Sequence, residues 1–305
     1  MINFRQYPQL TKIVIPNNVM NTYLLNKSTI NISNWFSELK NLQTVELNNY
    51  DRVLDMSYAY YNCISLKDSP QSGYNTQNMT YAYYGCSNLT GSPVCATRVT
   101  NLSYTYYGCS NLTGNSVCGL NVKNMSHAYE GCYSMTGYPR CNNNVLDMSY
   151  AYYNCTNING TPTCYKNVTN MSYAYYNCVN LTGASQCNNN VIDMSYAYYN
   201  CVKLSGNARC NNNVTNMAYA YYNCVNLNAG NSTWYAQNIT NVKNCFYGKN
   251  NSRRYNIRVP ADSVTLNTCL TNNEDSLVGV AITWSKALLN NYWYNSAYNI
   301  YIYAI

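Results

Sequence analysis

Cysteine is the residue type in this chain that could do the most chemistry, and its spacing is regular. Eight cysteines recur at a constant step and form one column. Six more each lie nine residues after a member of that column, and two lie near the C-terminal end. Thiols in such a pattern could form buried reduced columns, one disulfide per repeat, or metal ligands. The recurring column is Cys63, Cys86, Cys109, Cys132, Cys155, Cys178, Cys201 and Cys224; the second is Cys95, Cys118, Cys141, Cys164, Cys187 and Cys210; Cys245 and Cys269 remain.

The spacing argues against a metal site and weakly against disulfides. The chain has no Cys-x-x-Cys pair and a single histidine, His127, so we expect no zinc site. Ser72 and Thr233 stand where a second-column cysteine would fall, yet the matching Cys63 and Cys224 are kept. Members of a disulfide pair should be lost together, so buried thiols are favoured. Six disulfides are the alternative.

Catalytic constellations are not apparent. His127 and Glu130 lie three residues apart and could form a polar pair, but a lone exposed pair of this kind is usually surface variation. Asp55, Asp147 and Asp193 occupy one repeated position, where a capping role is expected. There is no Ser-His-Asp order, phosphate loop or paired-carboxylate motif. We therefore expect no enzyme, no cofactor and no metal.

The elements that position these residues are encoded by a motif with the consensus Met-Ser-Tyr-Ala-Tyr-Tyr-Asn-Cys. Eight copies, four of them with substitutions, follow one another at a constant step of 23, as from Met148 to Met171 (171 − 148). We number its first residue as position zero; these residues are Met56, Met79, Leu102, Met125, Met148, Met171, Met194 and Met217. Asp or Asn precedes position zero, Asn or Gly fills position six, and apolar residues fill positions zero, three, four and seven. Caps around one apolar helical face predict a short helix of about two turns.

The second half of each repeat changes its periodicity. Position ten is Leu, Met or Ile in every copy, and from there residues alternate, as in Leu89, Pro93 and Cys95 inward with Thr90 and Ser92 outward. This alternation predicts a short strand. A fixed period of this size indicates a solenoid in which each repeat stacks on its neighbours. The expected fold is thus an α/β solenoid with one short strand and one short helix in each repeat, capped at both ends.

This motif resembles the BspA-like leucine-rich repeat family of surface proteins. The resemblance rests on residues such as Asn170, Met171, Ser172, Tyr175, Cys178, Asn180 and Leu181, and it covers residues 51–248. The family usually has Met-Phe where this chain has Ala-Tyr, and its usual repeat is somewhat longer. The resemblance implies a leucine-rich-repeat-like solenoid that attaches to cells or matrix.

Three regions are predicted. Residues 1–50 form degenerate repeats or an N-terminal cap, with Leu39 and Leu42 aligned to the cysteine and leucine columns. Residues 51–248 form the regular solenoid, and residues 249–305 form a β-rich C-terminal cap or attachment segment. Strands are expected there near Val278–Trp284 and Tyr298–Tyr303.

Two surfaces are candidates for recognition. Positions two and five lie three residues apart and share a face of the expected helix, where tyrosines would form a double column. Stacking of these rings between repeats, with no binding role, is the alternative. The other candidate is the outward face of the strands, at Arg140, Gln186 and Arg209. The tyrosines are Tyr58, Tyr81, Tyr104, Tyr150, Tyr173, Tyr196 and Tyr219 at position two, and Tyr61, Tyr84, Tyr107, Tyr153, Tyr176, Tyr199 and Tyr222 at position five.

Composition directs the functional hypothesis to an exterior surface. The net charge of +7 comes from few charged residues, 10% of the chain, and no apolar run is long enough to span a bilayer. The start lacks the apolar segment of a secretory signal, which favours a virion, such as a phage tail or fibre, over a cell wall.

We expect a non-enzymatic adhesion protein that binds a host-surface glycan or protein. Self-association or attachment to a larger assembly is expected, without nucleic acid or membrane insertion. A structural subunit of a filament, coat or lattice is the alternative.

Overall fold

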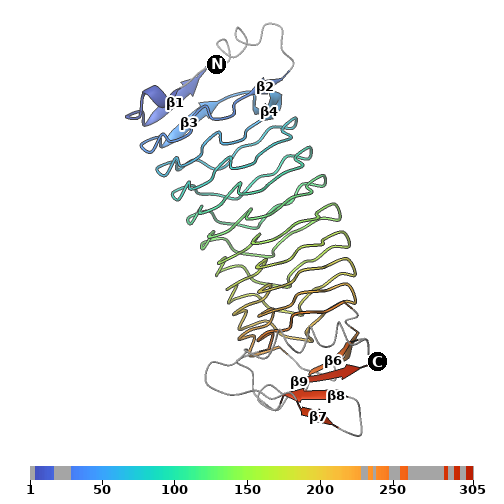
Figure 1. The fold of residues 1–305 in the computed structure, drawn as a ribbon. Coiled ribbons are helices and arrows are strands. Elements are labelled where there is room, and N and C mark those ends of the chain that lie inside the picture. The colour runs from blue at the N-terminus through green and yellow to red at the C-terminus, as the bar shows by residue number, and fades with distance from the viewer. Residues whose placement is uncertain are drawn as a thin grey trace. The chain divides into compact units, whose positions relative to one another are not determined.

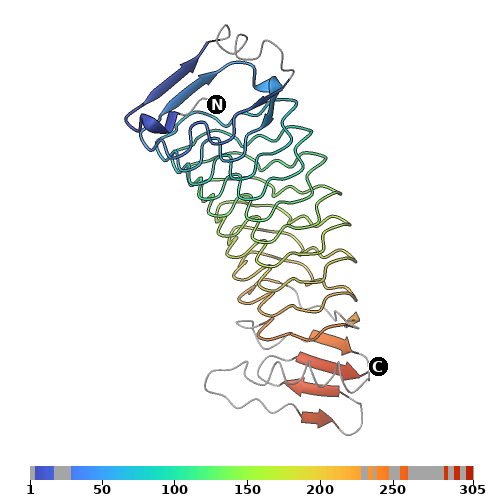
Figure 2. The same cartoon turned by 45° about the horizontal axis from the view of Figure 1, so that its top comes forward.

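A computed structural model of the chain describes residues 4–16, 29–227, 233–235, 238–246, 255–259, 285–287, 292–295 and 300–304. The chain divides into two compact units, Met1–Ile158 and Asn159–Ile305. Within each unit the chain winds in successive rungs that stack side by side (Figures 1 and 2). The fold is therefore a solenoid-like repeat, as the periodicity predicts.

The first unit begins with short strands and irregular rungs. Two 3-10 turns, η1 (Phe4–Gln6) and η2 (Tyr50–Arg52), accompany four strands: β1 (Lys12–Ile15), β2 (Ile30–Asn31), β3 (Thr44–Leu47) and β4 (Val53–Asp55). Strand β1 pairs in parallel with β3, and β2 pairs in parallel with β4. Residues 32–42 already form a rung, because the Phe36 N–H donates to the Ala59 carbonyl at 3.0 Å and the Phe36 ring stacks on Tyr60.

The predicted helix over positions zero to seven is wrong. Within the described residues no α-helix occurs, and positions one to six of each repeat are hydrogen-bonded turns. In the first copy, the N–H groups of Ala59, Tyr61 and Cys63 each donate to the carbonyl three residues earlier. The N–H groups at the even positions instead donate to carbonyls of the next rung, so the i to i−4 hydrogen bonds of an α-helix do not form.

The even positions join neighbouring rungs. Met56, Tyr58 and Tyr60 donate their N–H groups to the carbonyls of Asn78, Thr80 and Ala82, at 3.0, 3.0 and 2.8 Å. The same pattern recurs in later copies within each unit, for example from Tyr196 to Ala218 at 2.8 Å. Every backbone donor of this segment therefore has a partner, half of them within the rung and half on the next one.

Two positions in each turn segment adopt left-handed backbone geometry. Position six does so as predicted, with φ of 57° at Asn62 and 71° at Gly85. Position two also does so, although it is usually tyrosine: φ is 57° at Tyr81 and 55° at Tyr196. A bulky residue in this region is strained unless its surroundings hold it there.

The Asn or Asp before position zero forms a turn, although no helix follows for it to cap. Asp55 Oδ1 accepts a hydrogen bond from the Ser57 N–H at 2.8 Å, and Asn124 Oδ1 accepts one from Ser126 at 2.8 Å. This is the side-chain-to-backbone bond of an Asx turn. Residues at this position also form parallel bridges from one rung to the next, such as Asn78 with Asn101.

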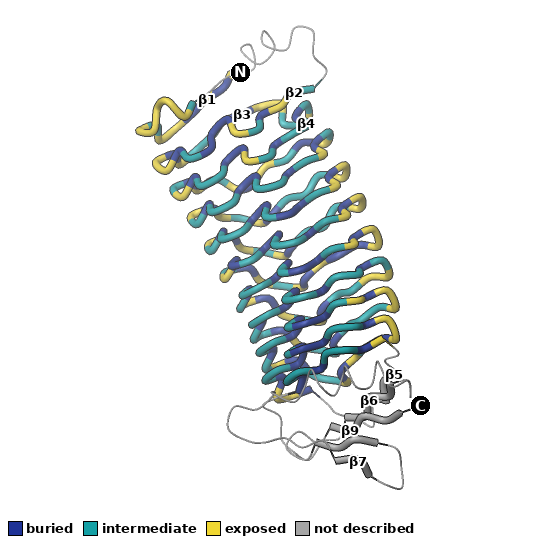
Figure 3. Tube along the Cα trace, in the orientation of Figure 1, coloured by how far each residue is buried: buried dark blue, intermediate teal, exposed yellow. Residues whose placement is uncertain are grey.

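The second half of the repeat keeps the predicted alternation without becoming a regular strand. Leu89 and Pro93 are buried whereas Thr90 and Ser92 are exposed, but no strand is formed there. The exposed residues gather at the turns that end the rungs, and buried residues line their length (Figure 3). The prediction is thus correct about the inward and outward sides of this segment and wrong about its secondary structure.

The core consists of the predicted apolar columns. Positions zero, three, four, seven and ten are buried in every described copy, as at Met148, Ala151, Tyr152, Cys155 and Ile158, each at most 1% exposed. The position-four rings stack face to face in the first unit, from Tyr60 to Tyr83 at 5.0 Å between centroids. In the second unit Tyr198 stacks on Tyr221 at 5.4 Å.

The second unit contains a five-stranded sheet in the order β5-β6-β9-β8-β7. Its strands are β5 (Thr233–Tyr235), β6 (Tyr255–Val259), β7 (Ser285–Ala287), β8 (Tyr292–Asn295) and β9 (Ile300–Ala304). Strand β9 matches the strand expected near its position, whereas Val278–Trp284 lies outside the described residues. The proposed boundaries at residues 50 and 248 stay predictions.

Candidate binding surface

The tyrosines at positions two and five form two adjacent columns on the outside of the rungs, which we call the tyrosine surface. Its members are half-buried, and Tyr58 reaches 36% exposure at the end of the first column. Each ring therefore has one edge in solvent, as the sequence predicts for this pair of positions. The turn geometry that replaces the helix keeps positions two and five side by side.

The rings of the first unit stack in register. At position two, Tyr58 and Tyr81 are 4.7 Å apart between centroids and 7° from parallel, and Tyr81 and Tyr104 are 4.6 Å apart at 4°. At position five, Tyr84 and Tyr107 are 4.5 Å apart at 5°. These distances match the spacing of neighbouring strands, so the rungs set the ring separation.

The second unit repeats this geometry. Tyr173 and Tyr196 stack at 4.5 Å, and Tyr199 and Tyr222 at 4.5 Å. Within one rung the two columns meet at an angle, with Tyr196 and Tyr199 5.8 Å apart and 33° from parallel. The aromatic stacking offered as the alternative to a binding role is therefore present, and it also builds a regular aromatic surface.

Backbone bonds hold both columns in place. The Tyr81 N–H donates to Ser103 of the next rung at 3.1 Å, and the Tyr84 N–H donates to the Tyr81 carbonyl at 3.3 Å. Position two thus lies on an inter-rung bond, and position five is tied to position two. The rings are ordered before any ligand arrives, which lowers the entropy cost of binding.

The hydroxyls of Tyr81 and Tyr196 stay neutral over the physiological range. Partial burial, followed by the charges of neighbouring tyrosines, raises the pKa of Tyr81, and the same causes raise the pKa of Tyr196 to about 12. A neutral phenol can both donate and accept a hydrogen bond. The surface therefore combines apolar ring edges with a row of donors and acceptors.

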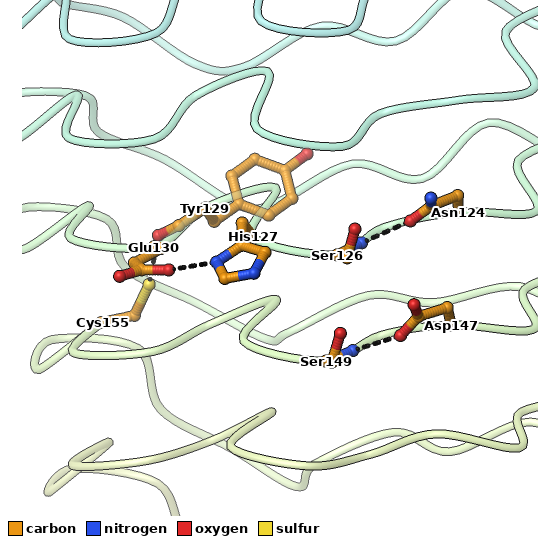
Figure 4. Close-up of polar contacts among 8 residues, drawn as sticks. All are labelled: Asn124, Ser126, His127, Tyr129, Glu130, Asp147, Ser149 and Cys155. Carbon is orange, nitrogen blue, oxygen red and sulfur yellow. Dashed lines mark hydrogen bonds and ion pairs between the residues drawn. The ribbon is translucent and has the colours of Figure 1, made fainter.

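One rung departs from this pattern, as Figure 4 shows. His127 takes position two and stacks between Tyr104 at 4.2 Å and Tyr150 at 4.5 Å. Glu130 takes position five, and its Oε2 lies 2.5 Å from His127 Nδ1. The two side chains are 21% and 16% exposed, so the pair is set into the surface. The sequence predicted an exposed pair; the structure places it partly buried.

Tyr133 joins the same rung and was missed by sequence reasoning. It fills position eight, where the other copies have Ile, Ser, Thr or Val, and it is 48% exposed. Its hydroxyl lies 4.0 Å from the place that a Cβ atom would take on Gly131. The ring therefore folds back beside the position-five column, and its unusual residue type is the feature that could have revealed it.

The alternative strand face lies elsewhere on the rungs. The Arg140 and Arg209 side chains are exposed and Gln186 is half-buried. Their backbones are fixed by core tyrosines, since Tyr152 Oη donates to the Arg140 carbonyl at 2.6 Å and Tyr198 Oη to the Gln186 carbonyl at 2.8 Å. The structure does not bring these three residues together with the tyrosine surface.

All fifteen cysteines in the described part of the chain are free thiols, as the favoured interpretation expects. The first column is fully buried, and its thiols donate to position-four carbonyls of the preceding rung, as Cys86 does to Tyr60 at 3.0 Å. In the second column, Cys118 Sγ accepts a bond from Asn142 Nδ2 at 3.0 Å. Burial raises the pKa of Cys63 to about 12 and that of Cys95 to about 11, so neither is an activated nucleophile. Cys269 lies outside the described residues.

Among the described residues, no three His, Cys, Asp or Glu side chains lie close enough together to hold a metal ion. Nor does that part of the chain contain a helix with the length and apolarity needed to cross a bilayer.

Each copy of the repeat carries a buried leucine or a related apolar residue at position ten. Residues 3–136 match the family model described as BspA type Leucine rich repeat region (6 copies). Residues 146–259 match the model described as Mycoplasma protein of unknown function, DUF285. These two matches support a BspA-like leucine-rich repeat family for the chain. No curated protein matches the chain by sequence.

Proposed function

We propose that this protein is a non-enzymatic adhesion protein whose tyrosine surface binds a host-surface glycan or protein. BspA-like repeat proteins are generally surface proteins related to adhesion and are typically not enzymes, which supports the class. The observation that carries the proposal is the ordered double column of half-buried tyrosines.

The chemistry of this surface suits repeated weak contacts. Tyrosine contributes a large rigid area at low entropy cost, and its hydroxyl adds a hydrogen bond. Rungs about 4.8 Å apart present the same contact again and again along the column. A ligand that engages several rungs gains affinity through effective concentration, although each contact alone is weak.

The experiment replaces tyrosines of position two and measures attachment to intact host cells. Tyr196→Asn removes one ring and places a residue that tolerates the left-handed backbone found there, with φ of 55°. We expect this variant to lose little attachment. The combined change of Tyr173, Tyr196 and Tyr219 to Asn should reduce attachment steeply, by about tenfold or more.

The matched control removes the alternative strand face. Gln186→Ala with Arg209→Ala, and Arg140→Ala separately, should leave attachment within about twofold, because these residues lie apart from the tyrosine columns. Each variant is first checked for unchanged circular dichroism and melting temperature. Unchanged attachment in the triple tyrosine variant, or loss dominated by Arg140 or Arg209, would reject the proposal.

A second candidate is a structural subunit of a filament, coat or lattice. The aligned rings favour it as well, because a flat aromatic surface can pack against a second copy of itself. Sedimentation of the purified protein separates the two: the structural role predicts assemblies that the triple tyrosine variant dissolves. The preference for a virion over a cell wall also stays a prediction, and immunogold labelling of the native source tests it.

A further inference from the structure

We propose that the rung of His127, Glu130 and Tyr133 is a binding site for an organic ammonium group within the tyrosine surface. The inference rests on the proposed function and names the ligand chemistry of one part of that surface. Three residues of one rung depart from the repeat together. His127 and Glu130 are in contact, and the Tyr133 hydroxyl lies beside Gly131, the residue that follows Glu130.

Glu130 interrupts a column of rings. It stands at position five between Tyr107 and Tyr153, where a tyrosine would otherwise stack on both. Those two rings belong to rungs that are two steps apart, which corresponds to roughly 9–10 Å at the usual strand spacing. A cation midway between them would lie about 5 Å from each ring, within the reach of about 6 Å for cation–π attraction.

The negative charge at this place is available to a ligand. Glu130 Oε2 faces His127 Nδ1 at 2.5 Å, and the other carboxylate oxygen has no hydrogen-bond partner among the described residues. The side chain is 16% exposed, so it is partly withdrawn from water but can be reached from it. An ion pair in such a setting is stronger than one on an open surface.

The charge of this carboxylate affects the pKa of neighbouring tyrosine hydroxyls. Burial and then the Glu130 charge raise the pKa of both Tyr107 and Tyr153. Tyr133 also raises the pKa of both phenols. Tyr107 and Tyr153 fill position five in the rungs before and after Glu130, so tyrosines flank the carboxylate on both sides. Aromatic rings with a carboxylate are the groups that recognise ammonium ions.

The rung is also rigid, which favours a site over a chance variation. His127 is held between Tyr104 and Tyr150 by stacking, and its backbone keeps the left-handed geometry of position two, with φ of 57°. The Gly108 N–H donates to the Glu130 carbonyl at 2.7 Å. The carboxylate is thus positioned from both the side chain and the main chain.

Titration calorimetry on the full chain tests the site with two ammonium probes. Choline carries a quaternary ammonium, and D-glucosamine carries a primary ammonium on a sugar; 3,3-dimethylbutan-1-ol and N-acetylglucosamine are their neutral counterparts. We expect at least one charged probe to bind about tenfold more tightly than its neutral counterpart. The tighter of the two identifies the source of the ammonium group.

Two variants test the residues. Glu130→Gln keeps the shape and removes the charge, and Glu130→Tyr restores the residue of the other copies and completes the column. Both should weaken binding of the charged probe by about tenfold or more, whereas Glu46→Gln, on strand β3, should leave it unchanged. Because the repeat tolerates tyrosine at position five, Glu130→Tyr is expected to fold even if Glu130→Gln does not.

The outcome separates this site from the adhesive function. Absence of binding by both charged probes, or equal binding in both Glu130 variants, overturns the ammonium site. Cell attachment by the wild-type chain in that case would leave adhesion through the other tyrosines standing. Probe binding that depends on Glu130 supports the site even if the triple tyrosine variant still attaches to cells.

Discussion

Tyr83 and Gln71 are 12 residues apart in the chain and are joined by one hydroxyl. Tyr83 Oη accepts a hydrogen bond from the Gln71 N–H at 2.8 Å and donates one to the Gln71 carbonyl at 2.8 Å. The Tyr106 hydroxyl makes the same pair of hydrogen bonds to the Val94 backbone. A single phenol thus satisfies both backbone groups of a residue that has no sheet to pair with.

Tyr83→Phe should therefore destabilise the protein although it removes one atom. The N–H and carbonyl of Gln71 would lose their partner on the buried Tyr83 side chain, a cost of about 1–3 kcal/mol. Urea denaturation followed by circular dichroism measures the change. Tyr84→Phe, on the tyrosine surface, is the matched control and should shift stability by less than about 0.5 kcal/mol. Equal effects of the two variants would contradict the bridging role.

Asn177→Val should destabilise the protein through the backbone. Asn177 has φ of 58°, and a β-branched residue resists this geometry at a cost of about 1–3 kcal/mol. Asn177→Gly is the control, because glycine enters the left-handed region freely and fills the same position in other copies. A melting temperature of Asn177→Val equal to that of wild type would refute the assignment.

Native protein should react slowly with a thiol reagent at neutral pH, and denatured protein should titrate close to all 16 cysteines. The described thiols are free, and burial raises the pKa of Cys63 to about 12, so little thiolate is present. The count uses Ellman's reagent with and without denaturant, in the absence of reductant. Recovery of only about four thiols would instead establish six disulfides.

Stability should fall in alkali. Burial raises the pKa of Tyr83 well above its ordinary value of 10.0 and that of Cys86 well above 9.0. Because these groups stay neutral in the fold and ionise first in the unfolded chain, their stabilisation is complete below about pH 9 and is lost as pH rises toward the folded values. Melting temperatures from pH 7 to 11 test this, with a shallower decline expected for Cys86→Ala. A flat profile to pH 11 would count against the buried columns.

Much of the core could be predicted because the eight copies of the repeat can be compared position by position within one chain. Met148, Tyr152 and Cys155 are fully buried, as the apolar spacing indicated. Residues at the same position of successive repeats meet in successive rungs, so each column has one environment and accepts one kind of residue. The same comparison located the tyrosine surface, because polar replacement at His127 and Glu130 marks positions that reach solvent.

The site rung was only partly predictable. His127 and Glu130 stand out in sequence, but their 2.5 Å contact and the stacking of His127 between Tyr104 and Tyr150 depend on the folded path of the chain. Tyr133 is three residues beyond Glu130, and local spacing does not say that its hydroxyl lies beside Gly131.

By itself, the sequence determined the period, the buried columns and the left-handed position six, since each depends on residue type at a repeated place. Tertiary structure alone decided that the apolar spacing of Met56, Ala59 and Tyr60 builds turns in place of a helix. That spacing suits a helix and a series of turns equally, and the hydrogen bonds of the backbone N–H groups decide between them. The N–H groups of Met56 and Tyr60 donate to carbonyls of the next rung at 3.0 and 2.8 Å, so inter-rung hydrogen bonds replace the helical ones.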